Sequence, residues 1–164
     1  MKKLFSVLCF ALVVIFASDI VNAQCKCGGY TYEKDNSRKS RYKTAYEEFQ
    51  DSTSVFVGKV IEVKKVKTKS AYKDDYNYKV KFKVEKSWKK NTPNEIVITQ
   101  GGGCILSFKE GEEHLVYASL SKKDLWVAFC SRTRELIYAE EDLKEFEEKG
   151  EKPQDIVEKT KPKQ

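Results

Sequence analysis

The residues whose types and spacing could do chemistry are the cysteines. Cys25 and Cys27 are separated by one residue and preceded by Gln24, whereas Cys104 and Cys130 stand far downstream. In an oxidising compartment such a set forms disulfides, and in the cytosol four cysteines could instead hold zinc. The compartment in which the chain folds therefore decides the chemistry of these residues.

The first 23 residues have the pattern of a secretory signal peptide. Residues 1–3 form a basic start, residues 4–17 are almost wholly apolar, and residues 21–23 read Val-Asn-Ala. This order suits signal peptidase, and the apolar run is shorter than the about 20 residues that span a membrane. We expect cleavage after Ala23, because cleavage after Gln24 would put Asn22 and Gln24 at the positions that require small residues. A lipoprotein is not expected, because Gln24 occupies the position just before Cys25, where a small residue is required. The sequence predicts an exported protein, extracellular or periplasmic, that does not span the membrane.

Because an exported chain folds in an oxidising compartment, we expect the cysteines of the mature chain to form disulfides. Cys9 leaves with the signal peptide, so four cysteines remain, and four cysteines allow three connectivities. Pairing Cys25 with Cys27 would close a small strained ring, which leaves two long-range patterns open. Either pattern ties the N-terminus to two distant parts of the chain, and each loop stabilises the fold by about 4–5 kcal/mol in the chain-entropy model.

Alternation of apolar and polar residues predicts strands in the middle of the chain. In residues 76–85 the aromatic and aliphatic side chains occupy every second position, as in a half-buried strand. Residues 55–63 form a second strand, in which Gly58 predicts a bulge or a tight bend. Turn-forming residues separate these strands from three shorter ones, and together they predict a small closed barrel or a sandwich. The shorter strands are expected over residues 95–99, 114–118 and 125–129.

Two helices flank the predicted strands. Residues 44–49 read TAYEEF, a short helix, and in residues 139–150 Ala139, Leu143 and Phe146 form one apolar stripe that ends at Gly150. We expect a single domain over residues 24–135, a C-terminal helix over 136–150 and a disordered polar tail over 151–164.

The motifs of common enzymes are missing from this sequence. His114 is the only histidine, and in its β-like run it is expected to be structural. There is no GxSxG, HExxH or P-loop pattern, and disulfides would leave no thiol to act as a nucleophile. We therefore expect a protein that is not an enzyme and needs no cofactor.

The charge of the chain is mildly basic. The formal net charge is +6, with acidic and basic residues interleaved. Lys79, Lys81 and Lys83 lie on the face of their strand opposite to the aromatic residues. A nucleic-acid platform needs both kinds of side chain on one face, so no nucleic-acid partner is expected. A polyanionic glycan is the partner that this lysine face fits.

Several short motifs follow one another in an order that resembles a known family. Cys-x-Cys at 25–27 follows the predicted signal peptide, a predicted helix containing A-x-x-x-F comes next, and Cys-Ser-Arg-Thr at 130–133 is the last of these motifs. In this order and cysteine placement, over residues 25–134, the chain resembles the tissue inhibitors of metalloproteinases (TIMPs), particularly their single-domain bacterial relatives among the netrin-like modules. The motifs are A-x-x-x-F at 45–49, VFVGKV at 55–60, Trp88 after the alternating strand, a glycine-rich turn before Cys104, SF at 107–108, GE at 111–112, LVYA at 115–118 and CSRT at 130–133.

The resemblance implies a fold and a disulfide pairing. The fold is mainly β, an OB-like five-stranded barrel with flanking helices, stapled by two disulfides. The pairing is Cys25 with Cys104 and Cys27 with Cys130.

The resemblance also implies a secreted inhibitor of a zinc metalloendopeptidase. Its inhibitory wedge would consist of Cys25, Lys26 and Cys27, beside Gly103 and Cys104. The α-amine and carbonyl of Cys25 would bind the zinc of the target protease in trans, at the position that such a zinc keeps open.

This sequence departs from the family pattern at the N-terminus. Cleavage after Ala23 leaves Gln24 first, so that the nitrogen of Cys25 would be an amide, which is a poor zinc ligand. Zinc binding therefore requires Cys25 itself to be N-terminal. The chain also lacks the second small domain and the additional cysteines of the animal inhibitors. The alternative is a secreted binding or structural module that recognises a polyanionic glycan or a cell-surface partner without inhibiting a protease.

Overall fold

The structure is a computed structural model, which describes residues 25, 27, 30–32, 38–40, 42–68, 76–89, 92–101 and 104–156. The predicted signal peptide and its cleavage site lie outside these residues, as do residues 157–164 of the predicted tail. Over the part that is described, the chain is mainly β, with two α-helices and two disulfides.

None of the described helices combines the length and the apolar character needed to cross a lipid bilayer.

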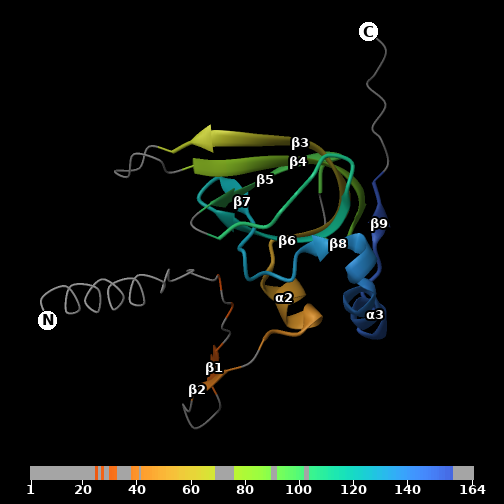
Figure 1. Cartoon of the computed structure of the whole chain (residues 1–164). Helices are drawn as coiled ribbons and strands as arrows, with labels where there is room; N and C mark the ends of the chain where they lie inside the picture. The colour runs from red at the N-terminus through yellow and green to blue at the C-terminus, as the bar shows by residue number, and fades with distance from the viewer. Residues whose placement is uncertain are drawn as a thin grey trace, which may run out of the picture.

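One sheet contains most of the strands, and five of them form a ring (Figure 1). Neighbours in the sheet follow the order β3-β4-β5-β7-β6-β8, and β6 also pairs with β3, which closes the ring. All pairings in the ring are antiparallel except that of β5 with β7, which is parallel. The strands are β3 (Ser54–Lys67), β4 (Tyr76–Ser87), β5 (Glu95–Gly101), β6 (Glu113–Ser121), β7 (Asp124–Trp126), β8 (Arg134–Glu135) and β9 (Gln154–Asp155).

The bulge predicted at Gly58 is confirmed. The register between β3 and β4 shifts between Val57 and Gly58, where the strand bends around the core. A Cβ atom at Gly58 would lie 2.9 Å from the carbonyl oxygen of Lys83 and 3.2 Å from the ring of Phe56. Only glycine allows the two backbones to approach this closely.

The alternation predicted for β4 is reflected in its burial. Val80, Phe82 and Val84 are buried inside the ring, where the ring of Phe82 packs edge-on against those of Phe56 and Phe108. The polar residues between them point outwards. This interior is the main core of the protein, and each large side chain buried there contributes about 1.5–3 kcal/mol.

A second core lies between the outer surface of the sheet and the helices. Helix α2 (Ala45–Asp51), the 3₁₀ helix η1 (Leu136–Tyr138) and helix α3 (Glu140–Glu148) lie on one side of the ring (Figure 1). Phe146 is fully buried, and its ring centroid lies 5.0 Å from that of Phe49 and 5.4 Å from that of Trp88. These contacts fix both helices on strands β3 and β6.

Each helix has a capping motif at one end, and the second helix ends before Gly150, as the sequence predicts. Thr44 and Glu47 form a capping box at the start of α2, which satisfies two backbone N–H groups reciprocally. After α3, Gly150 adopts a φ of 78°, and the N–H groups of Gly150 and Glu151 donate to the carbonyls of Glu147 and Phe146. This is a Schellman motif, in which glycine takes the left-handed position.

Two sequence expectations need correction. The strand expected over residues 125–129 ends at Trp126, because the chain turns towards Cys130 and the N–H of Ser131 donates to the carbonyl of Ala128. The tail expected to be disordered from residue 151 forms β9, which pairs with the end of β4. There β4 extends beyond its pairing with β5 and leaves an open edge, and Ile156 packs against the main core.

The sequence expectations also missed three short pairings. Strands β8 and β9 join the main sheet, and β1 (Tyr30–Tyr32) pairs with β2 (Arg38–Ser40) in a sheet of their own. Strands of two or three residues are too short for a period-2 pattern to reveal them.

Candidate functional site

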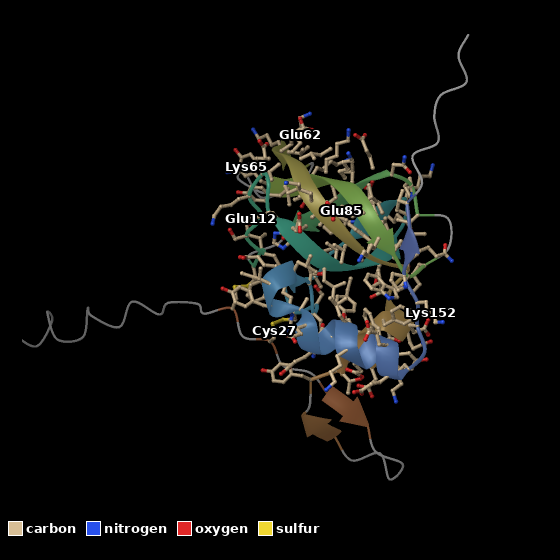
Figure 2. The ribbon with its side chains drawn as sticks, turned by 90° about the vertical axis from the view of Figure 1, so that its right-hand side faces the viewer. Cys27, Glu62, Lys65, Glu85, Glu112 and Lys152 are labelled. Atoms are coloured by element: carbon tan, nitrogen blue, oxygen red, sulfur yellow. A yellow bond between two sulfur atoms is a disulfide. The ribbon has the colours of Figure 1, made fainter. Side chains whose placement is uncertain are left out.

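Two disulfides attach the start of the described chain to the ring of strands. Cys25 bonds to Cys104, just after β5, and Cys27 bonds to Cys130, just after β7. This is the pairing that the resemblance to the TIMPs implies. Cys25 is exposed, whereas Cys27 and Cys104 are half-buried. We call the segment formed by Cys25, Cys27 and Cys104 the N-terminal ridge; Figure 2 shows Cys27 on the side of the sheet that carries the helices.

Tyr42 gives the ridge a further attachment. Its hydroxyl donates a hydrogen bond of 2.7 Å to the carbonyl oxygen of Cys27. Cys27 is thus held through its side chain by Cys130 and through its backbone by Tyr42. The contact brings together two residues that are 15 positions apart in the sequence.

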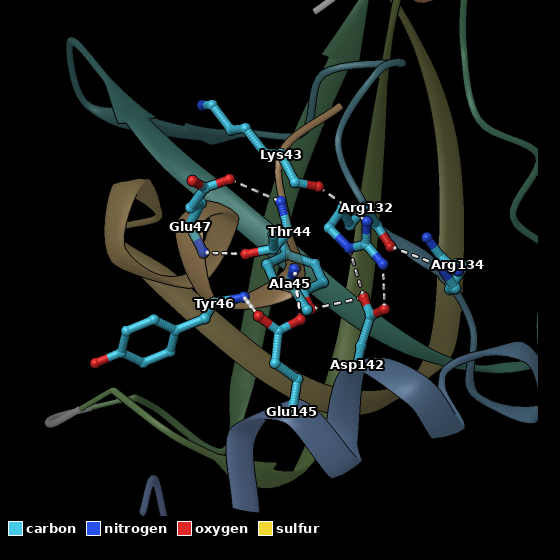
Figure 3. Close-up of polar contacts among 10 residues, drawn as sticks. Lys43, Thr44, Ala45, Tyr46, Glu47, Arg132, Arg134, Asp142 and Glu145 are labelled. Atoms are coloured by element: carbon cyan, nitrogen blue, oxygen red, sulfur yellow. Dashed lines mark hydrogen bonds and ion pairs between the residues drawn. The ribbon is translucent and has the colours of Figure 1, made fainter. Parts of the chain in front are cut away.

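An ion pair connects the Cys130 loop to helix α3. The Arg132 guanidinium donates to both carboxylate oxygens of Asp142, at 3.0 Å from Nε and 2.5 Å from Nη2 (Figure 3). The remaining nitrogen, Nη1, donates to the carbonyl oxygen of Lys43, next to Tyr42. Arg132 therefore joins the loop after Cys130, the segment before α2 and helix α3.

Asp142 is fully buried, and both oxygens of its carboxylate accept hydrogen bonds. Besides Arg132, it accepts a hydrogen bond of 2.8 Å from the hydroxyl of Tyr117 on β6. Burial, followed by the nearby charge of Asp142, raises the pKa of Tyr117, so the hydroxyl stays a donor. The hydrogen bonds from Arg132 raise the pKa of that guanidinium, which remains charged.

Glu145, one turn further along α3, completes this connection. Its carboxylate accepts hydrogen bonds of 3.0 Å and 3.2 Å from the backbone N–H groups of Ala45 and Tyr46 (Figure 3). These groups lie in the first turn of α2 and have no partner within that helix. The two carboxylates of α3 thus hold the elements that lead to the ridge.

A pocket of about 630 Å³ lies beside the ridge. Cys27, Cys130 and Tyr42 line it together with Lys43 and Arg134. Lys43 is neutralised by Asp51, 2.8 Å away, and this hydrogen bond raises its pKa. Glu48 also lines the pocket and lies 3.8 Å from Lys43, so the wall carries both basic and acidic groups.

The lysine face lies elsewhere on the sheet. Lys79, Lys81 and Lys83 project from the outer face of β4, and Lys81 forms an ion pair of 2.5 Å with Glu95. In the strand register, Lys64 lies opposite Lys79, and Lys59 lies opposite Lys83. Figure 2 shows the neighbouring Glu62 and Lys65 at the end of the sheet away from Cys27.

The structure brings together some of the predicted site residues. Cys25, Cys27 and Cys104 lie together, whereas Lys26 and Gly103 lie outside the described residues. In the part that is described, no group of three or more His, Cys, Asp or Glu side chains could hold a metal ion. Sequence reasoning missed the supporting residues, which are Tyr42, Arg132, Asp142 and Glu145. A signal existed for Asp142, which interrupts the apolar stripe of its helix with an acidic residue.

No family model fits this sequence, and no curated protein is similar enough to be matched to it. The assignment to the TIMPs and netrin-like modules therefore stays a prediction from the motifs and their order.

Proposed function

We propose that this protein is a secreted, non-enzymatic inhibitor of a zinc metalloendopeptidase, built on a netrin-like domain. The observation that carries the proposal is the N-terminal ridge: Cys25 is exposed, and disulfides fix both Cys25 and Cys27 on the ring of strands. A protease cleft accepts an extended, exposed segment of this kind. The two disulfides and the predicted signal peptide agree with an extracellular or periplasmic location.

The ring of strands supports the fold that this function requires. We interpret the closed order β3-β4-β5-β7-β6 as an OB-type barrel, with α2 and α3 as its flanking helices. The ridge is then attached to the barrel through the chain that leaves β5 and the chain that leaves β7.

The inhibitory chemistry depends on preorganisation. A free amine and a carbonyl on the same residue can close a five-membered chelate ring at the open position of a catalytic zinc. The disulfides fix Cys25 before binding, so little conformational entropy is lost when the ridge enters a cleft. The hydrogen bond from Tyr42 occupies the carbonyl of Cys27, which leaves Cys25 as the residue for the zinc.

The test begins with the N-terminus of the secreted protein, determined by intact mass and N-terminal sequencing. Protein that starts at Cys25 is then assayed against a panel of zinc endopeptidases that includes thermolysin. Acetylating the amine, or adding one alanine before Cys25, should abolish inhibition because the nitrogen becomes an amide. An inhibition constant that stays the same after both changes would rule out chelation, and a native N-terminus at Gln24 would contradict the proposal.

A second function is favoured by the lysine face. Like charges opposite each other in a sheet are destabilising, and the register places Lys64 against Lys79 and Lys59 against Lys83. A sulfated glycan would neutralise these pairs. The alternative proposal is therefore a binding module for a polyanionic glycan.

Retention on a heparin column tests this alternative. Binding to a polyanion should weaken steeply with salt, as counterion release predicts. Replacing Lys79, Lys81 and Lys83 by Gln should lower the salt concentration needed for elution. Replacing Lys144, Lys149 and Lys152 near the C-terminus provides a control with the same change in net charge. Equal elution of the two variants would mean that retention follows net charge and not the lysine face.

A further inference from the structure

An apolar pair protrudes from the molecule beside a group of carboxylates. Ile137 and Tyr138, at the end of η1, have exposed fractions of 74% and 66%. Beside Ile137 is a hollow of about 330 Å³, which is also lined by Glu113 and Glu135. We call Ile137, Tyr138, Glu113 and Glu135 the acidic face.

A second hollow has the opposite character. It has a volume of about 430 Å³ and extends across β3, β4, β5 and β7. Val97, whose exposed fraction is 45%, and Leu125 provide its apolar part. Four lysines line it together with two acidic residues, Glu62 and Asp124, so the lining carries a net positive charge. We call this set the basic face: Val97, Leu125, Lys64, Lys79, Lys81 and Lys123.

Both faces carry charge that the fold does not neutralise. Lys64 reaches Glu62, at 2.7 Å, and Lys81 reaches Glu95, but Lys79 and Lys123 form no ion pair with any residue in the described ranges. Over the same ranges, Glu113 and Glu135 form no ion pair within 4 Å either, although the register places Lys59 opposite Glu113. The direct opposition of Lys64 and Lys79 is unfavourable in the isolated sheet. Partners of opposite charge would therefore stabilise each face.

The two faces of one molecule cannot neutralise each other. Strand β8, which carries Glu135 and leads into η1, pairs with β6 at His114 and Leu115. Strand β7, on the basic face, pairs with β6 at Ser119 to Ser121. These points are four to seven residues apart along β6, or about 14–24 Å, and Figure 1 shows β7 and β8 near different ends of β6.

We propose that copies of this chain associate head to tail, with Ile137 and Tyr138 of one copy packed on Val97 and Leu125 of the next. The carboxylates beside the protruding pair then meet the lysines around the hollow. Such a contact is heterologous, because each copy contributes a different surface. It contains none of the ridge cysteines, so the association is independent of the proposed inhibition.

The proposed contact is small and charged at its edge. Interfaces below about 1,200 Å² are usually weak and transient. Exposed charges are screened within about 10 Å at 0.1 M salt and within about 3 Å at 1 M salt. The association should therefore depend on protein concentration and weaken strongly as salt is added.

Sedimentation equilibrium of the secreted protein, with both disulfides formed, tests the proposal. Oligomers should appear as concentration rises at low salt and should decline as the salt concentration approaches about 1 M. The double variant Ile137→Ser/Tyr138→Ser should lower the association constant by about tenfold or more, because it removes about 1.4 kcal/mol or more of apolar contact. Ile105→Ser, an exposed apolar residue outside both faces, is the matched control and should leave the association constant unchanged.

Charge reversal tests whether the two faces contact each other directly. Glu113→Lys/Glu135→Lys makes both faces basic, and Lys79→Glu/Lys123→Glu makes both acidic. Each variant alone should stay monomeric, whereas an equimolar mixture should associate again. Circular dichroism checks that each variant is folded; if a reversal does not fold, the Ile137/Tyr138 variant still decides.

Three results would overturn the proposal. The first is a protein that stays monomeric up to the solubility limit at low salt. The second is association that persists in the Ile137→Ser/Tyr138→Ser variant. The third is association that appears only when heparin is added, which would mean that a polyanion bridges lysine faces.

Discussion

Removing the carboxylate of Asp142 should strongly destabilise the protein. In Asp142→Ala, the Arg132 guanidinium and the Tyr117 hydroxyl both lose their partner. Breaking a buried ion pair by removing one member costs about 3–5 kcal/mol. Because 24% of the Arg132 side chain is exposed, water can partly solvate it, which favours the lower end of that range. The unpaired hydroxyl of Tyr117 increases the loss of stability by about 1 kcal/mol. The higher helix propensity of alanine reduces the loss by about 0.5 kcal/mol.

The expected loss is therefore about 3.5 kcal/mol, out of the about 5–15 kcal/mol that stabilise a typical domain. Urea unfolding with intact disulfides measures this loss; for an m-value of about 2 kcal/mol/M, the midpoint should fall by about 1.8 M. Glu141→Ala, an exposed neighbour on the same helix, is the control and should change stability by less than about 0.5 kcal/mol.

The double variant Arg132→Leu/Asp142→Leu separates a lost ion pair from an unpaired buried charge. It removes both charges together and should recover part of the stability lost in Asp142→Ala. A loss below about 1 kcal/mol in Asp142→Ala would refute the view that this carboxylate holds α3 to the Cys130 loop.

Three further predictions concern the fold around the site. Burial lowers the pKa of His114 despite the nearby Glu112 and Glu135, so the unfolded chain binds the proton more tightly; stability should fall as the pH drops below about 6.5. In His114→Phe this part of the pH dependence should vanish in unfolding curves from pH 7.5 to 5, and an unchanged slope would contradict it. Gly58→Ala places a Cβ against the Lys83 carbonyl and should cost about 1–3 kcal/mol in thermal or urea unfolding, unlike an exposed alanine substitution at Lys86. Thr44→Ala removes the side chain that caps α2 and should cost about 1 kcal/mol in the same assay, whereas Thr44→Ser should be close to neutral.

Much of the architecture was predictable because it rests on local patterns. A strand with one buried face needs an apolar residue at every second position. Residues 76–85 show this alternation, which predicted both strand β4 and the face that it buries. Gly58 marked the bulge, and TAYEEF and the apolar stripe ending at Gly150 marked the two helices. These features depend on neighbours within a few residues, so the sequence displays them directly.

The supporting contacts of the candidate site could not be predicted in the same way. Tyr42 reaches Cys27 across 15 residues, and Glu145 reaches Ala45 across 100. Arg132 was visible in the sequence as part of Cys-Ser-Arg-Thr, but its partner Asp142 sits on a helix whose position depends on the packing of Phe146. Contacts of this kind exist only after the helices have docked on the sheet.

By itself, the sequence predicted an export signal whose removal would leave four cysteines, and it showed that the chain is rich in strand-like patterns and carries no common catalytic motif. The tertiary structure decided which cysteines pair, how the strands close into a ring, and which charges lie together. It also showed that residues 154–156 join the sheet, because the open edge of β4 accepts them. The physical reason is that sequence patterns record which side chains prefer to be buried, whereas disulfides, ion pairs and complementary faces depend on where distant segments meet.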